Sequence, residues 1–482
     1  MLNSSTKEKA KKKKSPWCWV RRGALVLLLV YVVMALAPCA LPPQLTPEEK
    51  ADTSWMTTGA SDLHVDRALL IPTGQQALDT RLALIQSAQS SIDLGSYIFA
   101  SDESGRRIAS ALLAAADRGV KVRLITDGLV GSVHLARSPL GAALGSHPNI
   151  EIKFFNPINL LRPQGLNARY HEKFFIVDET WLLLGGRNIS DEFLTSEGDP
   201  HYNYDQDVLM YRTDASRRGA ATQMGEYFAA MWNSDVCGLR YDDPKAAEKK
   251  RVIAYRQELS ALWQELTATH DLTLPDPETD MVDVEKTLLL ANPTDPASTK
   301  PVLWERMCQL METAQERLWI ITPYLVMDGA MRDTLTRVCQ QAPADAKLLV
   351  NSRQSGNNII ASADYTIHRP MAERLGIPLW EFHGDWSIHT KSVLIDHDLS
   401  LIGSFNFDPR SAYLDTELMV AVYSEGLNGQ LAANMDARWA QSLQVQDGEY
   451  LPGAVEPHRA SFWKMASIVL LSPFISLVRF LT

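Results

Sequence analysis

Two stretches of this chain carry one pattern of residues: HEKFFIVDETWLLLGGRN at residues 171–188 and HTKSVLIDHDLSLIGSFN at residues 389–406. Each begins with His-x-Lys, continues with Asp after an apolar run, and ends with Gly-x-x-Asn. Every one of these positions is separated from its counterpart by 218 residues, so the internal spacing is identical. A single His-x-Lys triplet has no diagnostic value, but two complete copies predict a duplicated structural unit.

Apolar runs flank these polar residues and predict strands. Residues 174–177 and 393–395 follow the two His-x-Lys triplets, and residues 182–184 and 399–402 precede the two asparagines. Residues two apart on a strand point to the same face, so the His and Lys of each copy should lie together. The amide of the asparagine that follows the second strand is expected close to the same face.

The chain around the motifs has the apolar periodicity of alternating helices and strands. The expected helices and strands are residues 77–90, 92–99, 106–118 and 120–125 in the first half, and residues 302–315 and 318–325 in the second. This alternation favours an α/β fold with helical layers on a sheet. A chain of 482 residues is also long for one hydrophobic core, so two domains are expected.

The polar residues of the two motifs point to an anionic substrate. His and Asp are metal ligands, but a lysine two residues from each histidine would repel a cation. A buried lysine needs a partner, and a phosphate would provide one for Lys173 and Lys391. The lysines and the amides of Asn188 and Asn406 would stabilise a five-coordinate transition state. One histidine would attack phosphorus and form a phosphohistidine, while the other protonates the leaving alcohol.

With its duplicated His-x-Lys-x4-Asp signature, the sequence resembles the phospholipase D superfamily over residues 63–451. The resemblance implies two α/β/α repeats packed as a pseudo-dimer, with the active site at their interface and no metal or other cofactor. It implies catalytic roles for six residues: His171, Lys173, Asp178, His389, Lys391 and Asp396. The two aspartates would shape the local loop rather than touch phosphate.

The same resemblance implies supporting residues. Three residues are expected to bind the substrate phosphate: Asn188, Ser404 and Asn406. An acidic residue on the next strand usually holds the second nitrogen of the histidine. Glu417 fits this role in the second half and Asp207 fits it in the first, with Asp205 as the alternative. By analogy, His171 is expected to be the nucleophile.

Finer features resemble the class C branch of bacterial cardiolipin synthases. They are the run NARYHEK at residues 167–173 and the run GSFNFDPRS at residues 403–411. Two departures stand out. Better-known members begin with two membrane spans and this chain has one candidate. Gly186 also stands where many relatives have Ser, and Arg187 either compensates for the missing hydroxyl or is a surface residue.

The charge of the chain is unevenly distributed. The net charge is −10, but residues 1–22 contain eight basic residues and one acidic residue, which leaves −17 for the remainder. An acidic body disfavours a nucleic-acid partner. Residues 23–41 carry no charge and are just long enough to cross a bilayer, at roughly 20 residues.

The charges on either side of this run predict the topology. Basic residues precede it and acidic residues follow it, so the amino end is expected in the cytoplasm. The catalytic body would then face outward, on the periplasmic side of the bacterial cytoplasmic (inner) membrane. A cleaved signal segment and lipid attachment at Cys39, within Leu-Ala-Pro-Cys, remain alternatives.

The composition divides the chain into seven segments. They are a basic cytoplasmic N-terminus (1–22), an anchor or signal segment (23–41), a linker (42–63), the first phospholipase D-like domain (64–243), a helical and Pro-rich connector (244–290), the second domain (291–451) and an apolar C-terminal segment (452–482). Residues 465–478 are almost wholly apolar but too short to span a bilayer. We expect them to lie on the membrane surface, with packing on the core as the alternative.

Together these observations favour a phosphatidyltransferase that makes cardiolipin or a related phospholipid. Phosphatidylglycerol is the expected acceptor and a candidate donor. Phosphatidylethanolamine is a further candidate substrate. A small accessory protein is a possible partner whose identity the sequence does not indicate. A hydrolase that releases phosphatidic acid is the main alternative, because only water exclusion and acceptor binding distinguish the two. A nuclease of the same fold is disfavoured by the acidic body and the apolar ends.

Overall fold

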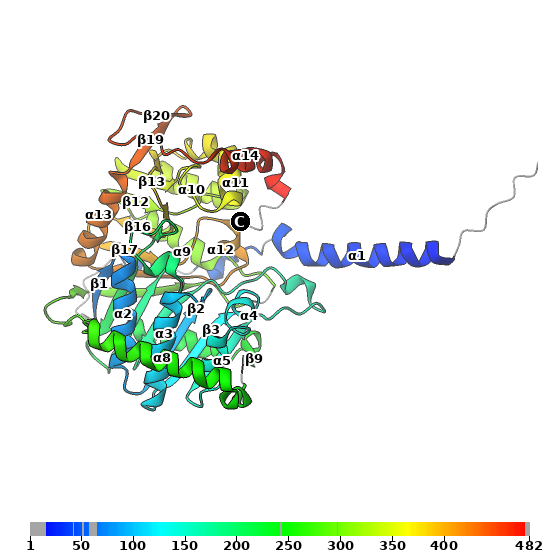
Figure 1. Cartoon of the computed structure of the whole chain (residues 1–482). Coiled ribbons are helices and arrows are strands. Elements are labelled where there is room, and N and C mark those ends of the chain that lie inside the picture. The colour runs from blue at the N-terminus through cyan, green and yellow to red at the C-terminus, as the bar shows by residue number, and fades with distance from the viewer. Residues whose placement is uncertain are drawn as a thin grey trace, which may run out of the picture.

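The computed structural model describes residues 16–41, 43–50, 53–56, 65–241, 243–295 and 297–477. Most of the basic N-terminus, the end of the expected linker and the last residues of the expected docking segment lie outside these ranges. The described part contains two large mixed sheets with helices around them (Figure 1).

The first sheet has nine strands in the order β10-β1-β8-β6-β5-β2-β3-β4-β9. Their bounds are β1 Asp66–Ile71, β2 Ser91–Ser96, β3 Lys121–Asp127, β4 Ile150–Phe155, β5 Lys173–Val177, β6 Trp181–Gly185, β8 Asp207–Arg212, β9 Leu239–Tyr241 and β10 Val282–Val284. The first motif occupies the antiparallel pair β5–β6, and β2 joins β5 on its other side.

The second sheet has the order β11-β18-β17-β16-β12-β13-β14-β19-β20. Its first eight strands repeat the run β1-β8-β6-β5-β2-β3-β4-β9 of the first sheet, and β10 and β20 are additional edge strands. Its strands are β11 Lys286–Ala291, β12 Arg317–Ile321, β13 Asp345–Asn351, β14 Leu379–Phe382, β16 Ser392–Ile395, β17 Leu399–Gly403, β18 Leu418–Tyr423, β19 Ser442–Gln446 and β20 Glu449–Tyr450. The pair β16–β17 carries the second motif at the position that β5–β6 holds in the first sheet. The expected α/β fold of two similar repeats is therefore confirmed.

The helices form layers because each has an apolar face that a sheet or a neighbouring helix can bury. The outer layer of the first half contains α2 Gly74–Ser87, α3 Glu103–Asp117, α5 Pro139–Gly145 and α8 Lys250–Thr269, and that of the second contains α9 Val302–Met311, α10 Gly329–Gln341 and α11 Ile359–Ala372. A third core cluster joins the inner faces of both sheets with α7 Ala220–Trp232 and α13 Glu425–Trp439. The two halves therefore share a core.

Short backbone pairings cross between the halves beside the motifs. The strands β7 Asn203–Tyr204 and β15 Ser387–Ile388 are parallel partners, and Tyr170 forms an isolated bridge with Thr416. Each pairing joins the residue before one motif histidine to the segment before β8 or β18 of the other half. The two histidines are thus positioned by both halves at once.

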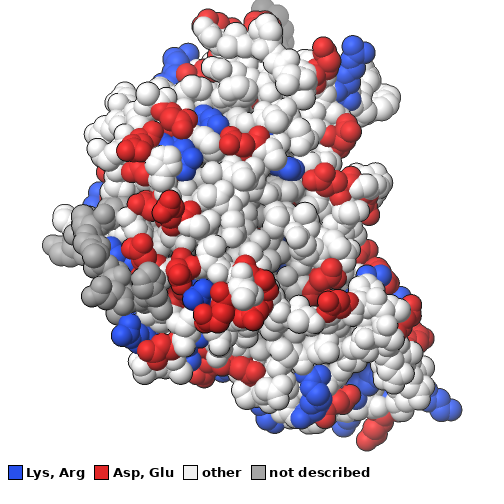
Figure 2. Space-filling model, turned by 90° about the vertical axis from the view of Figure 1, so that its left-hand side faces the viewer, with Lys and Arg blue, Asp and Glu red and all other residues white. Residues whose placement is uncertain are grey.

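The first helix, α1 Pro16–Ala40, projects from the body (Figure 1). Its segment Trp19–Ala40 is long and apolar enough to cross a membrane, and none of it is buried inside the protein. The side of the body turned away from α1 has acidic and basic side chains spread across it (Figure 2).

Some element ends differ from those expected. The strand expected over residues 318–325 ends at Ile321, because Pro323 has no N–H for a sheet ladder.

Residues 244–290 were expected to connect two domains. Their helix α8 instead packs on α3 and α5 of the first half, and β10 and β11 join the first and second sheets, respectively.

Candidate active site

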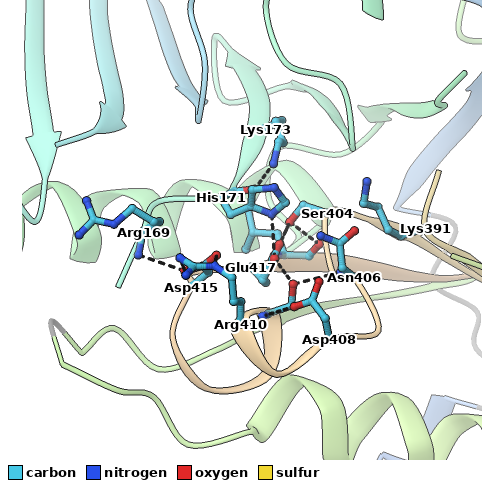
Figure 3. A network of polar contacts seen from close by, with 12 residues as sticks. Arg169, His171, Lys173, Lys391, Ser404, Asn406, Asp408, Arg410, Asp415 and Glu417 are labelled. Atoms are coloured by element: carbon cyan, nitrogen blue, oxygen red, sulfur yellow. Dashed lines mark hydrogen bonds and ion pairs between the residues drawn. The ribbon is translucent and has the colours of Figure 1, made fainter. Parts of the chain in front are cut away.

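The motif histidines meet in one pocket between the halves. His171 precedes β5 and His389 precedes β16, and both line a pocket of about 410 Å³. Figure 3 shows His171 with Glu417 and Ser404 from the second half beside it. A histidine from each half therefore faces the same space.

Each histidine is held by a carboxylate from the opposite half. Nδ1 of His171 lies 2.8 Å from Oε1 of Glu417, and Nδ1 of His389 lies 2.7 Å from Oδ2 of Asp205. With Nδ1 donating to a carboxylate, the lone pair is on Nε2, which is the nitrogen available to a substrate. The two pairs are related by the internal repeat.

The structure corrects the assignment of Asp207 as the first-half partner. Its carboxylate is buried against Arg81 and Arg187, with N–O distances of 2.9 Å and 3.2 Å. The strand register gives the reason. Asp207 pairs with Gly185, and the equivalent glycine of the second half, Gly403, pairs with Met419, so Asp207 corresponds to Met419 and not to Glu417. Asp205, the alternative named from the sequence, is therefore the counterpart of Glu417.

The two lysines lie behind the histidines. Lys173 Nζ donates to the carbonyl of His171 at 2.5 Å. Lys391 Nζ likewise donates to the carbonyl of His389, and it lies 2.7 Å from Nδ1 and 3.1 Å from Nε2 of that imidazole. Burial lowers the pKa of Lys173 to about 7, and that of Lys391 to about 8, although neighbouring carboxylates partly restore the charge. An entering phosphate would favour the protonated form of both.

Burial also keeps both imidazoles neutral. It lowers the pKa of His389 to about 3, with Lys391 adding to the effect, and it lowers the pKa of His171 well below its usual value, with Lys173 adding to the effect. A neutral imidazole is the form that can attack phosphorus. An anionic substrate would raise the pKa of the histidine that must act as an acid.

The two carboxylates differ in their surroundings. Burial raises the pKa of Glu417 to about 7, which Lys173 and two serine hydroxyls only partly oppose. Burial alone would also raise the pKa of Asp205, but Lys391 and the hydrogen bond with His389 lower it to about 2. A Cβ on Gly186 would lie 2.4 Å from Asp205, so the serine of many relatives does not fit there.

Arg187 is neither a surface residue nor part of the pocket lining. It is 1% exposed, and its guanidinium donates to the carbonyls of Ile71, Pro72 and Asp205. These contacts, together with the ion pair to Asp207, hold Arg187 in the interior of the first half and outside the pocket lining. It therefore does not take the place of the missing serine hydroxyl.

The motif aspartates lie at turns. Asp178 accepts hydrogen bonds from the backbone N–H groups of Gln89, Ser90 and Ser91, and Asp396 accepts from those of Gln315, Glu316 and Arg317. Both adopt positive φ, at 51° and 49°. Neither aspartate lines the pocket. Their contacts join the hairpin β5–β6 to the segment after α2, and the hairpin β16–β17 to the segment after α9.

The three expected phosphate-binding residues take different positions. Asn406 lines the pocket, and its Oδ1 is buried without a hydrogen-bond partner in the described structure. Ser404 donates its hydroxyl to Oε2 of Glu417 at 2.5 Å, and Asn188 accepts from the N–H of Ile98 at 3.3 Å. Of the three, Asn406 is therefore the one placed to meet a ligand directly.

Several pocket residues were not predicted as site residues. Arg410 and Asp415 form an ion pair of 3.0 Å at one side of the pocket, and Tyr97 and Tyr324 also line it. Tyr97 contacts the ring of His171 edge-on at 5.3 Å between centroids. The two tyrosines follow the equivalent strands β2 and β12 but are one residue out of register in the repeat. Arg410 lies in the run GSFNFDPRS, so that signal was present in the sequence.

Two packed α/β repeats that join paired His-x-Lys motifs in one pocket define the phospholipase D class of proteins. Residues 82–232 and 307–439 match the family described as cardiolipin synthase, PLD-like domain. Cardiolipin synthase C of Escherichia coli is 32% identical over 422 residues, which cover 76% of this chain and 82% of that protein. Cardiolipin synthase A of Edwardsiella ictaluri is 25% identical over 407 residues, which cover 82% and 73%.

A solved structure shares the fold. Phosphatidylserine synthase of Haemophilus influenzae superposes with a TM-score of 0.60 at 16% identity, covering 87% of this chain and 98% of that one. This chain belongs to the cardiolipin synthase, PLD-like domain family.

Proposed function

We propose that this protein is a phospholipid-modifying enzyme, and specifically a phosphatidyltransferase that makes cardiolipin from phosphatidylglycerol. One observation carries the proposal: each histidine in the pocket has its Nδ1 held by a carboxylate of the other half and a buried lysine beside it. This arrangement suits a phosphodiester, which carries one negative charge, and the exchange of one of its ester alcohols for another. The similarity to two cardiolipin synthases supports the choice of lipid.

The reaction would proceed in two displacements at phosphorus. Nε2 of His171 attacks the phosphorus of the donor lipid. The bond from phosphorus to the oxygen of the head-group glycerol breaks, and His389 gives that oxygen a proton. The phosphatidyl group then rests on His171. His389 removes a proton from the hydroxyl of a second phosphatidylglycerol, whose oxygen attacks phosphorus and releases His171.

The other pocket residues would support this chemistry. Lys173, Lys391 and the amide of Asn406 would stabilise the charge that develops on the non-bridging oxygens. Asp178 and Asp396 would act indirectly, by holding the turns that follow the two motif strands. Asn188 would fix the backbone at Ile98, and Ser404 would fix the carboxylate of Glu417. Glu417 and Asp205 would orient the two imidazoles.

We further propose that α1 is an uncleaved anchor, with the catalytic body on the periplasmic face of the inner membrane. The apolar span Trp19–Ala40 and the basic residues before it support this topology. Lipid attachment at Cys39 is the competing form of anchoring. Mass spectrometry of the purified protein distinguishes the two, because lipidation would remove residues 1–38 and add acyl chains.

The function is tested with purified full-length protein and phosphatidylglycerol labelled in the head-group glycerol. We expect cardiolipin and free glycerol in equal amounts, and neither product from His171→Ala. Phosphatidic acid as the main product in bilayers, with no cardiolipin, would instead identify a hydrolase. Absence of both products with phosphatidylglycerol, alone or mixed with phosphatidylethanolamine, would contradict the proposed activity.

A further inference from the structure

Exposed apolar side chains surround the mouth of the pocket and have no part in the chemistry. The rim loop, which we define as residues 156–167 between β4 and β5, carries Ile158, Leu160 and Leu161, and Leu161 is 92% exposed. Leu129 and Val133, at the short helix α4 Val130–His134, are also exposed. The pocket lining includes Leu129 and two residues of the rim loop, Leu166 and Asn167, so the segments that carry these exposed side chains border the pocket.

The rim loop runs beside the last turns of α1. Asn167 Nδ2 donates to the carbonyl of Ala35 at 2.9 Å, and the 3-10 turn η3 Pro163–Gly165 contacts α1 (Figure 1). Asn167 also lines the pocket, and its backbone carbonyl accepts a hydrogen bond from the guanidinium of Arg410 at 2.9 Å. This residue therefore connects α1 directly to the pocket.

The length of α1 fixes the level of this contact in a bilayer. The span Trp19–Ala40 has 22 residues, or about 33 Å of helix, which matches a hydrocarbon layer of roughly 30 Å. Ala35 lies five residues before the end of the span, about 7.5 Å of helical rise. When α1 fills the hydrocarbon layer, the base of the rim loop lies within the outer part of that layer, at the level of the upper acyl chains.

The rim loop has the chemistry that a lipid environment requires. Residues 156–161 include no charged side chain. At the tip, the N–H of Leu161 donates to Oδ1 of Asn159 and the N–H of Arg162 donates to the carbonyl of Asn159, both at 2.9 Å. These bonds matter because an unsatisfied backbone group in lipid costs several kcal/mol. Arg162 follows the apolar tip, where a long cationic side chain can reach lipid phosphates.

We propose that the rim loop, together with Leu129 and Val133, is seated in the leaflet that contains the C-terminal end of α1. Leu160 and Leu161 lie at the level of the upper acyl chains, and the pocket opens into the head-group layer. A phospholipid then reaches His171 and His389 by lateral movement, without leaving the leaflet. The proposal rests on α1 spanning the membrane, and it gives the proposed function its route of substrate entry.

The first test measures depth directly. A fluorescent dye is attached to Leu161→Cys in the full-length protein, with Cys18 and Cys39 replaced by serine, in nanodiscs of phosphatidylcholine and phosphatidylglycerol. The remaining cysteines, Cys237, Cys308 and Cys339, are buried. Ile253→Cys, an exposed position on α8, is the matched reference.

We expect lipids with a spin label on the acyl chain to quench the dye at residue 161 strongly and the dye at residue 253 weakly, with the reverse order for aqueous iodide. Quenching of residue 161 by iodide alone would overturn the proposal. Protection from both quenchers together with cross-linking to a second protein molecule would show that a protein covers the loop, and would overturn it too. The measurement needs no turnover, so a protein that makes no cardiolipin but inserts the loop would refute the proposed function and leave this inference intact.

The second test separates access from chemistry. The double variant Leu160→Asp/Leu161→Asp should lower the initial rate on phosphatidylglycerol in bilayers by at least about tenfold, because a carboxylate at the acyl boundary is unfavourable. The rate on a short-chain, water-soluble phosphatidylglycerol and the Tm should remain unchanged, and Ile253→Asp should alter neither rate. A loss on both substrates with a lower Tm would show that the loop serves folding instead.

Discussion

The two motif histidines are equivalent in sequence but not in their surroundings. Asp205, with a pKa of about 2, is ionised throughout the working range beside His389, whereas burial leaves Glu417 beside His171 with a pKa of about 7. An ionised carboxylate stabilises an imidazolium more than a partly protonated one does. On this basis the proposed mechanism gives the role of general acid to His389 and that of nucleophile to His171.

The first residue-scale prediction concerns these roles. His171→Ala and His389→Ala should each lower kcat by at least about 10³-fold, because neither histidine can replace the other. Release of labelled glycerol in a single turnover gives the rate. His147→Ala, which removes a histidine paired with Asp117 in the first half, is the control and should remain active. Near-normal activity in either motif variant would contradict a shared site, and an alkali-stable phosphohistidine at His389 alone would reverse the assignment.

The second residue-scale prediction separates Asp205 from Asp207. Asp205→Asn removes the charge that orients His389 and should lower kcat by about 10²-fold with little change in Tm. Asp207→Asn leaves Arg81 and Arg187 buried beside a neutral amide, so it should cost about 3 kcal/mol of stability. Rates and thermal unfolding are measured on the same preparations. A large loss of kcat at normal Tm in Asp207→Asn alone would restore the assignment made from the sequence.

At the scale of elements, α14 Phe462–Leu471 and the turn η6 Ser472–Leu477 have two distinct faces. Ile468 and Ile475 pack against Ala363 of α11, and the hydroxyl of Ser472 donates to the carbonyl of Ala363 at 3.1 Å. The opposite face exposes a second set of apolar side chains: Phe462, Trp463, Val469, Leu470 and Phe474. The segment therefore packs on the body with one face and exposes a second apolar face.

This division gives the element-scale prediction. Trp463→Asp/Leu470→Asp should reduce activity on bilayers several-fold and leave activity on a short-chain substrate unchanged. Ile468→Ala should instead cost about 2–4 kcal/mol of stability and lower both activities at raised temperature. Vesicle flotation, both rates and Tm are compared. Equal losses on the two substrates in the double variant would leave α14 as a structural helix only.

Most elements could be predicted because apolar periodicity is a local property. The helix expected over residues 77–90 is α2 Gly74–Ser87, and the strand expected over residues 120–125 is β3 Lys121–Asp127. The sequence could not show that α8 belongs to the first half, because the surface that buries its apolar face comes from α3 and α5. Sequence spacing alone does not identify that surface.

At the scale of the whole molecule, the site depends on how the halves pack. The resemblance carried by the two motifs was sufficient to predict two histidines at one interface. It could not show that Glu417 reaches across to His171 and Asp205 across to His389, because these contacts depend on the bridge between Tyr170 and Thr416 and on the pairing of β7 with β15. The preference for Asp207 over Asp205 was wrong because the register of β8 on β6 cannot be derived from the sequence spacing.

The shared pocket supplies its positive charge from both halves, and this leads to a prediction about metals. In the proposed mechanism, Lys173 and Lys391 take the part that a cation next to the phosphate takes in a metalloenzyme. Activity on a short-chain substrate should therefore be unchanged after prolonged treatment with EDTA. The short-chain substrate is used because divalent ions also alter bilayers. A loss of turnover that Mg²⁺ or Zn²⁺ restores would contradict this mechanism.

The same pair of lysines predicts how substrate affinity depends on pH. Burial sets the pKa of Lys173 at about 7 and that of Lys391 at about 8 in the absence of substrate, while the phosphodiester stays anionic throughout. Binding an anion favours protonated lysines, so affinity should be constant below pH 7 and should fall as the pH rises through 7 to 8 and beyond. We expect KM for a short-chain substrate to rise about tenfold between pH 6.5 and 9. Lys173→Arg, whose side chain stays charged, should reduce that rise. A KM that stays flat to pH 9, or that decreases, would show that the lysines do not bind the phosphate.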